Sequence, residues 1–243
     1  MQHRHLRHRA GRLILGDRFD AVWLDAGGVL VLPDPTVLGP LLAYYGGVDE
    51  VERHRRAHYA AMAVKSAQGA EERDWREYDR AYVRSIGVTD GDLDEAAAVL
   101  GHARIAALWR WPIPDSMEAL ASLAAGGVPL GVVSNASGQI EAVLQRSRVC
   151  QVGSGAGVPV RCVVDSAVVG VAKPDPRIFD FAAEHFPDVD RGRVCYVGDS
   201  VTMDVAGATA AGLHPILLDP FADHRGARFE RIRSLMELTQ FCP

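Results

Sequence analysis

Five polar side chains stand at places in the chain where they could act together on an anionic group. Three are carboxylates, one is a hydroxyl and one is an ammonium. Asp25, Ser134 and Asp199 each follow a short apolar run of the chain. Carboxylate oxygens without a nearby His or Cys suit Mg²⁺ better than zinc. A lysine and a hydroxyl can hold an anion by charge-assisted hydrogen bonds. The set consists of Asp25, Ser134, Lys173, Asp199 and Asp204.

The apolar runs before these residues predict the strands that must position them. Strands are expected at 21–24, 128–133, 160–164, 194–197 and 214–218. Between them, helical patterns cover 117–125, 140–146, 176–185, 201–211 and 228–238. This alternation predicts an α/β fold with a Rossmann-like, doubly wound parallel sheet. The carboxyl ends of parallel strands meet in one crevice, which would bring the five side chains together.

A stretch of about 75 residues after the first strand has helical periodicity and no predicted strand. Its helices are expected over 36–45, 49–66, 71–86 and 92–109, and prolines at 112 and 114 predict a hinge. We therefore predict a flexible basic leader at 1–18, a core domain at 19–34 and 112–243, and an inserted helical cap at 35–111. The basic run 53–58 is expected to be a solvated helix face, with the alternative that one face points at an anionic substrate. The aromatic residues Tyr44, Tyr45, Trp75 and Tyr78 are expected in the core of the helical bundle, and Trp109 between cap and core.

Composition narrows the class of partner. The net charge of −5 argues against general nucleic-acid binding, which requires a basic face. No apolar run approaches the roughly 20 residues that a membrane-spanning helix needs, and the first residues lack the apolar segment of a secretory signal. We expect a cytoplasmic protein, monomeric or homodimeric, that acts on a small molecule. Cys150 and Cys162 flank a Gly-rich segment and could pair, but free thiols are favoured in this setting.

In their order and spacing, these elements resemble the four motifs of the haloacid dehalogenase (HAD) superfamily. The matching segments are the strand ending at Asp25, Ser134-Asn135, Lys173-Pro174-Asp175-Pro176 and Gly198-Asp199 with Asp204. The helical insert resembles the C1-type cap of that superfamily, and the likeness covers about residues 19–220. The resemblance implies a Rossmann-like core, a cap that opens and closes, and in most members Mg²⁺-dependent phosphoryl transfer.

The resemblance also assigns roles to residues. It makes Asp25 the nucleophile that forms an aspartyl intermediate, with Ser134 and Lys173 holding the transferred group. The Mg²⁺ ligands would be Asp25, Asp199, the carbonyl of Gly27, and Asp204 directly or through water. Gly27, Gly28, Asn135 and the cap lysine Lys65 are the expected substrate-binding positions.

One position departs from the phosphatases of this superfamily. They carry a second Asp two residues after the nucleophile, as an acid and base, and this chain has Gly27 there. General acid–base help is typically worth about 10²–10⁴-fold in rate. Three readings follow: a phosphatase with atypical acid–base catalysis, a relative that cleaves C–halogen or C–P bonds, or an impaired enzyme that binds a partner. In the C–P reading, Lys65 would form an imine with the substrate.

Overall fold

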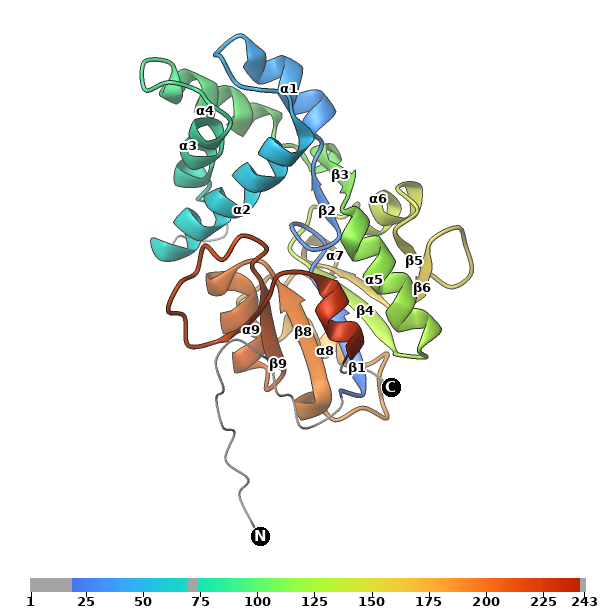
Figure 1. The fold of residues 1–243 in the computed structure, drawn as a ribbon. Helices are drawn as coiled ribbons and strands as arrows, with labels where there is room; N and C mark the ends of the chain where they lie inside the picture. Colours follow the sequence, from blue (N-terminus) through green and yellow to red (C-terminus); the bar gives the residue numbers. More distant parts are fainter. Residues whose placement is uncertain (1–18, 70–73, 241–243) are drawn as a thin grey trace.

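The computed structural model describes residues 19–69 and 74–240, so the leader expected at 1–18 lies outside the described residues. Six strands form one sheet in the order β10-β9-β8-β1-β4-β7, and every neighbouring pair is parallel (Figure 1). They are β1 (Ala21–Leu24), β4 (Leu130–Ser134), β7 (Val163–Asp165), β8 (Val194–Gly198), β9 (His214–Leu218) and β10 (Glu230–Ile232). The strand order reverses at β1, which confirms the predicted doubly wound sheet.

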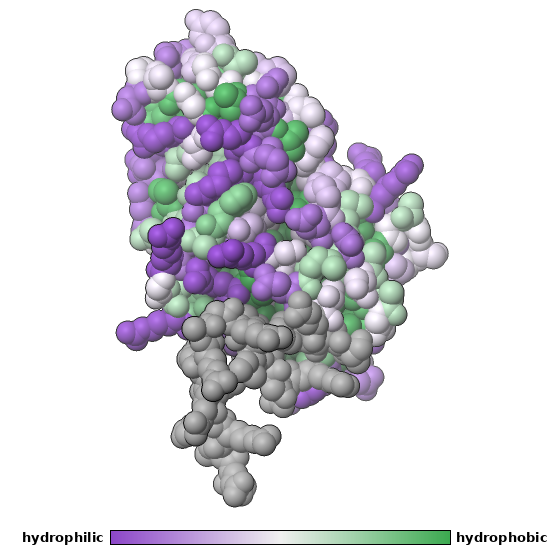
Figure 2. Space-filling model, in the orientation of Figure 1, coloured by the Kyte–Doolittle hydropathy of each residue, from purple (hydrophilic) through white to green (hydrophobic). Residues whose placement is uncertain are grey.

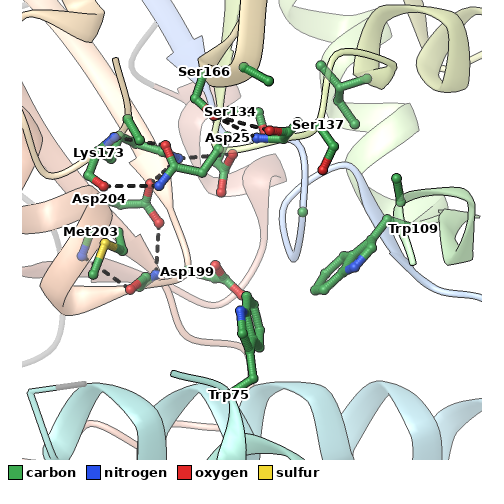
Figure 3. Close-up of a pocket in the computed structure, with 18 of the residues that line it drawn as sticks. Asp25, Trp75, Trp109, Ser134, Ser137, Ser166, Lys173, Asp199, Met203 and Asp204 are labelled. Carbon is green, nitrogen blue, oxygen red and sulfur yellow. Dashed lines mark hydrogen bonds and ion pairs between the residues drawn. The ribbon is translucent and has the colours of Figure 1, made fainter. Parts of the chain in front are cut away.

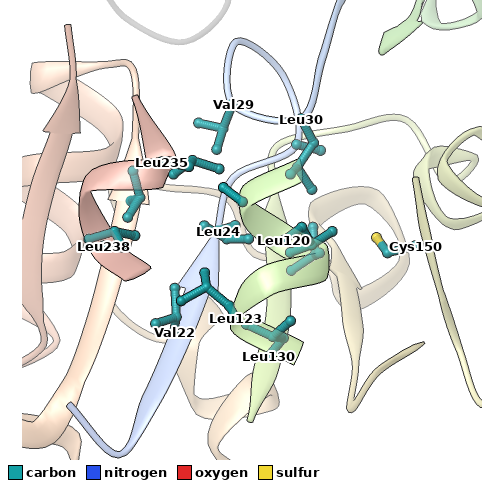
Figure 4. Packing of buried hydrophobic residues seen from close by; sticks show 14 of the residues in the cluster. Val22, Leu24, Val29, Leu30, Leu120, Leu123, Leu130, Cys150, Leu235 and Leu238 are labelled. Atoms are coloured by element: carbon teal, nitrogen blue, oxygen red, sulfur yellow. The ribbon is translucent and has the colours of Figure 1, made fainter. Parts of the chain in front are cut away.

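Both faces of the sheet are covered by helices. Successive side chains of a strand point to opposite faces, so neighbouring residues of β1 belong to different clusters. Val22 and Leu24 of β1 pack in a cluster with Leu120 of α5 (Pro114–Ala125) and Leu235 of the short helix η4 (Leu235–Gln240), as Figure 4 shows. Trp23 belongs to the cluster on the opposite face, which includes residues of α8 (Ile178–Ala183) and α9 (Ala206–Ala210). The central strand is therefore buried on both sides.

Shorter elements complete this part of the chain. Helices α6 and α7 and the turns η2 and η3 lie between the strands, and two short strands form a small sheet of their own. Their bounds are α6 (Ile140–Arg146), α7 (Ser166–Val169), η2 (Arg191–Arg193), η3 (Val201–Val205), β5 (Cys150–Val152) and β6 (Val158–Val160).

Four helices form a separate helical unit with its own buried cluster. They are α1 (Pro35–Ala43), α2 (Val51–Ala67), α3 (Arg76–Ser85) and α4 (Leu93–Ala103). The chain enters and leaves this unit through two antiparallel strands, β2 (Val31–Pro33) and β3 (Trp109–Pro112), and the turn η1 (Ala106–Leu108) precedes β3. In Figure 1 the helical unit lies beyond the end of the sheet toward which the arrow of β8 points.

Several predicted elements differ from the structure. The last predicted helix, 228–238, is instead the strand β10 followed by a 3-10 helix, because 230–232 pair with β9. The predicted helix 201–211 begins as a π-helix over 201–205. The short parallel pair β5 and β6, at 150–152 and 158–160, was not predicted. The predicted helix 92–109 ends at Ala103, and Trp109 begins a strand rather than ending a helix.

The surface of the molecule is mixed. On the face shown in Figure 2, hydrophilic residues cover much of the helical unit and hydrophobic ones are scattered. Tyr44, expected in the core of the bundle, is 87% exposed. Within the described ranges, no helix combines the length and the apolar character needed to cross a bilayer. Cys150 and Cys162 are both buried and do not form a disulfide with each other.

Candidate active site

A buried lysine joins two of the predicted carboxylates. Lys173 Nζ lies 3.0 Å from Asp25 Oδ1 and 2.6 Å from Asp204 Oδ1. It also donates a hydrogen bond of 2.9 Å to the hydroxyl of Tyr196. The lysine is 2% exposed, so these contacts lie away from bulk water. The structure therefore brings together three of the five side chains singled out in the sequence (Figure 3).

Burial and charge act against each other at this pair. Burial, opposed by the Lys173 ammonium and assisted by the charges of Asp204 and Asp199, raises the pKa of Asp25 to about 7. For Lys173, burial alone would lower the pKa, but the carboxylates of Asp204 and Asp25 outweigh it, so the pKa lies above its usual value. The lysine is thus held as a cation, and Asp25 is a carboxylate whose charge depends on compensation by neighbouring positive charge.

The backbone fixes Asp25 at the end of β1. Its N–H donates to the carbonyl of Val197 on the neighbouring strand β8, at 2.8 Å. The N–H of Ala26 donates to Asp25 Oδ1 at 2.7 Å, so this oxygen has two donors, one of them the lysine. Two donors on one oxygen hold the carboxylate in a single orientation.

Asp199 directly follows β8, and Asp204 lies on the π-helical turn η3. Asp204 is tightly held: Oδ2 accepts from the N–H of Ser200 at 2.9 Å, while Oδ1 contacts Lys173 and the hydroxyl of Tyr196. Gly198 is required beneath it, because a Cβ there would lie 2.0 Å from Asp204 Cγ. A single-turn π-helix is a common local distortion at functional sites.

The three carboxylates form a plausible donor set for a hard cation. One ligand oxygen each from Asp25, Asp199 and Asp204 can be chosen so that all three lie within 4.8 Å of one another. An all-oxygen set of this kind fits Mg²⁺. Both oxygens of Asp204 already accept hydrogen bonds from the protein. This favours a contact of Asp204 with the ion through water, and direct contacts of Asp25 and Asp199.

Ser134 is the last residue of β4 and Asn135 follows it, and both line the pocket. Ser134 is 3% exposed and pairs in register with Asp165 of β7. The side-chain amide of Asn135 is engaged with the backbone of Lys173: Nδ2 donates to the Lys173 carbonyl at 3.0 Å, and Oδ1 accepts from the Lys173 N–H at 2.8 Å. Asn135 therefore holds the lysine in place, whereas the sequence favoured a contact with substrate.

The two glycines after Asp25 differ in their surroundings. Gly28 has φ +69°, and a Cβ there would lie 1.9 Å from Asp199 Oδ2, so only glycine fits. Its N–H donates to the Val31 carbonyl, and its own carbonyl accepts from the Tyr59 hydroxyl. These bonds occupy the backbone groups that a substrate contact would need. Gly27 lines the pocket and lies beneath the indole of a tryptophan from β3, Trp109.

Sequence reasoning missed His58. Residues 53–58 were expected to form a solvated face, yet His54 and His58 are 2% and 1% exposed. His58 Nε2 lies 2.8 Å from Asp199 Oδ2, and its Nδ1 lies 2.8 Å from the Tyr78 hydroxyl. Because a carboxylate only accepts, Nε2 carries the hydrogen of the first contact. A signal was present: Ala61 and Met62, three and four residues on, mark the buried face of α2.

Lys65 lies on the same buried face of α2. It is 2% exposed and lines the pocket, and its Nζ is 3.6 Å from the centroid of the Trp75 ring. The guanidinium of Arg104 also lies over this ring, at 4.6 Å, and pairs with Asp79 at 2.7 Å. The structure thus places Lys65, which the sequence analysis expected at a substrate-binding position, on the wall of the pocket.

These groups surround one cavity of about 730 Å³ between the sheet and the helical unit. The carboxylates, Lys173 and Ser134 form its wall at the end of the sheet. Across from them lie the indoles of Trp75 and Trp109 (Figure 3), whose ring centroids are 6.1 Å apart. The cavity thus has a charged polar wall and an aromatic wall.

Comparison with known proteins identifies the family. The protein is of the α/β class, with a Rossmann-like parallel sheet and an acid–lysine cluster at the carboxyl edge of that sheet. The family model of haloacid dehalogenase-like hydrolases matches residues 19–212. The chain therefore belongs to the haloacid dehalogenase-like hydrolases.

Relatives of known name share part of this chain. Pyrimidine 5'-nucleotidase YjjG of Escherichia coli (strain K12) is 32% identical over 146 residues, covering 60% of this chain and 58% of the relative. The phosphoserine phosphatase of Thermus thermophilus is 32% identical over 130 residues, covering 53% and 49%. The chain spans about half the length of these relatives.

Solved structures share the fold over nearly the whole chain. A HAD phosphatase from Thermococcus onnurineus has a TM-score of 0.55 at 22% identity, covering 91% of this chain and 96% of the other. A dehalogenase with an intermediate complex has a TM-score of 0.58 at 20% identity, covering 93% and 98%. Phosphatase and dehalogenase thus match equally well, and the fold does not distinguish between them.

Proposed function

We propose that this protein is an Mg²⁺-dependent hydrolase that removes phosphate from a small phosphorylated compound through an aspartyl-phosphate intermediate on Asp25. The observation that carries the proposal is the buried Lys173 between Asp25 and Asp204, with Asp199 close by. Three carboxylates and one lysine need further positive charge before a phosphate can approach. A site that displaces halide from carbon has no phosphate dianion to neutralise at the reacting centre.

Asp25 is the nucleophile in this proposal. Its carboxylate attacks phosphorus in line, the bond to the leaving oxygen breaks, and the phosphoryl group passes to the aspartate. The two donors on Oδ1 keep the carboxylate in the orientation that this attack requires. Lys173 and Ser134 would hold the transferred oxygens by hydrogen bonds, and the lysine charge would offset the repulsion between carboxylate and phosphate.

The residues that would hold Mg²⁺ are Asp25 and Asp199, with Asp204 through water and the Gly27 carbonyl as a further ligand. When bound, the ion neutralises phosphate charge and stabilises the charge that develops during transfer. His58, by its contact with Asp199, fixes the orientation of that ligand from the helical unit. Fixing a ligand through its outer hydrogen bond is a general way to tune a metal site.

The helical unit, residues 35–111 in our proposal, acts as a cap over the site. Four contacts from α2 support this assignment by tying the unit to the core in the closed arrangement. They are His58 with Asp199, Tyr59 with the Gly28 carbonyl, Arg56 with Asp223, and Ser66 with the Val201 N–H. Opening would break these contacts and admit substrate, and closing would exclude water from the reaction.

The test is turnover of 4-nitrophenyl phosphate and of a panel of phosphorylated metabolites, with and without Mg²⁺. The panel includes nucleoside monophosphates, phosphoserine and triose phosphates, since named relatives are phosphatases of such compounds. We expect Mg²⁺-dependent phosphate release that Asp25→Asn abolishes. If the wild-type protein releases no phosphate from any of these compounds at any Mg²⁺ concentration, the proposal fails.

A second candidate, C–P bond cleavage, is favoured by one observation: Lys65 is buried and lines the same cavity. In that reaction the amine would form an imine with a carbonyl substrate. Borohydride treatment in the presence of a phosphonate aldehyde would trap a secondary amine on Lys65. Absence of the adduct, with Lys65→Arg unchanged in activity, would remove this candidate. Chloride release from 2-haloacids without metal would favour a dehalogenase. No reaction in any of these assays would favour a binding role.

A further inference from the structure

We infer that the substrate is the phosphate monoester of a phenol, whose oxygen leaves as an anion without receiving a proton from the protein. This inference rests on the proposed phosphatase function and specifies its substrate class. It depends on the surroundings of Gly27, on the engagement of His58, and on the aromatic wall of the cavity.

The position of the missing acid is filled by another side chain. A Cβ on Gly27 would lie 3.2 Å from Trp109 Cζ3 and 3.3 Å from Cε3. These distances are tighter than ordinary van der Waals contact, so the indole covers the place where a carboxylic acid would begin. Trp109 is itself held by ring contacts with His58, at 5.6 Å, and Trp75. The site is thus built around a tryptophan at the point where an acid would stand.

Among the described residues that line the cavity, His58 has the one imidazole, and it is engaged at both nitrogens. His58 Nε2 contacts Asp199 and Nδ1 contacts the Tyr78 hydroxyl, each at 2.8 Å. It therefore has no nitrogen directed at a leaving oxygen. Among the described residues that line the cavity, the other ionisable groups outside the carboxylate cluster are Lys65 and Arg104, both over the Trp75 ring. Counted together with Asp79, which pairs with Arg104, these groups have a net positive charge that would stabilise a departing anion.

A phenolic leaving group fits both features. A phenol has a pKa of about 10, against about 15.7 for water, so a phenolate leaves far more readily than an alkoxide. Its ring is flat, and the indoles of Trp75 and Trp109 offer it edge-to-face or offset contacts across the cavity from Asp25 (Figure 3). Recognition and reactivity then depend on the same aromatic group.

The chemistry balances without a protein acid. The Asp25 carboxylate forms a bond to phosphorus, the P–O bond to the ring breaks, and the phenolate leaves with the electron pair and takes a proton from solvent. Water then attacks phosphorus and the bond to Asp25 breaks. The carboxylate returns, and both hydrogens of the water end on the phosphate as dihydrogen phosphate.

The test is a leaving-group series on the wild-type protein. kcat/KM is measured with Mg²⁺ for phenyl phosphates whose ring substituents vary the phenol pKa, for an alkyl phosphate of similar size, and for acetyl phosphate. We expect log(kcat/KM) to fall steeply as the phenol pKa rises. The alkyl phosphate should be slower than phenyl phosphate by at least about 10²–10⁴-fold, the usual worth of an acid. Acetyl phosphate, a good leaving group without a ring, should have the higher KM.

Trp109→Phe and Trp109→Leu form the matched pair for the aromatic contact. We expect the Leu variant to raise KM for phenyl phosphates more than the Phe variant, with little difference for acetyl phosphate. A flat series, or an alkyl phosphate turned over as fast as phenyl phosphate, would overturn the inference and leave the phosphatase function standing. A flat series that becomes steep in His58→Gln would assign the acid to His58, which also overturns it. No turnover of any ester would overturn the function and the inference together.

Discussion

Restoring an acid at position 27 requires room as well as a carboxylate. Gly27 does not have the positive φ that excludes other residues, so its backbone accepts aspartate. The obstacle is the Trp109 indole, 3.2 Å from the position of the new Cβ. We therefore predict that Gly27→Asp alone is poorly tolerated, and that Gly27→Asp with Trp109→Ala gains activity on alkyl phosphates.

The magnitudes follow from this contact. Overpacking of a close-packed site costs about 1–3 kcal/mol, and a chain of this size loses roughly 2–4 °C in Tm for each kcal/mol. Gly27→Asp should therefore lower Tm by about 2–12 °C. Removing the indole should relieve the strain, with a coupling of about 0.5–3 kcal/mol between the two changes. The acid should then raise kcat/KM on an alkyl phosphate by up to about 10²–10⁴-fold over Trp109→Ala alone.

The assay combines thermal unfolding of the four proteins of the cycle with kcat/KM on glycerol phosphate and on 4-nitrophenyl phosphate. The gain should appear with glycerol phosphate and be small with the nitrophenyl ester, whose leaving group needs no proton. Gly27→Asn with Trp109→Ala is the matched control, since it has the same shape without the acid. If the Asn and Asp versions are equally active, or the double variant equals Trp109→Ala, the reasoning about position 27 is refuted.

Three further predictions concern charge at the site and closure of the helical unit. Mg²⁺ and a proton compete for Asp25, whose pKa is raised to about 7. Mg²⁺ affinity should therefore fall as the pH drops below about 7 and level off above it. Calorimetry at pH 6 and 8 checks this, and an equal change of affinity with pH in Asp25→Asn would contradict it. Lys173→Met leaves buried carboxylates without their counter-charge and should lower the free energy of unfolding by about 3–5 kcal/mol. Urea denaturation measures this loss, and a variant as stable as the wild type would contradict the prediction. Arg56 is bound to Asp223 by two contacts of 2.7 Å and joins α2 to the core. Arg56→Met should therefore speed amide hydrogen exchange in α2 and raise KM. Unchanged exchange would show that this ion pair does not hold the closed state.

The sequence by itself predicted the fold and the convergence of the polar residues. Strands and helices alternate, so the sheet had to be parallel, and parallel strands present their carboxyl ends at one edge. Asp25 and Asp199 follow two adjacent strands of that sheet, β1 and β8. Their proximity is a consequence of chain topology, and local apolar patterns were enough to predict it. The strand β10 was missed because three residues with helical periodicity pair with β9 only in the folded sheet.

Tertiary structure alone decided which residues of the helical unit reach the site. Helix α2 is rich in Arg and His, and its sequence does not tell which face the fold buries; packing against the core turned His58 and Lys65 inward. The same holds for Trp109, whose indole covers Gly27 because β3 returns beside β2. In the sequence, Gly27 shows only that a side chain is missing at this position. In the structure, the Trp109 indole occupies the space beside Gly27, and this contact joins residues far apart in the chain.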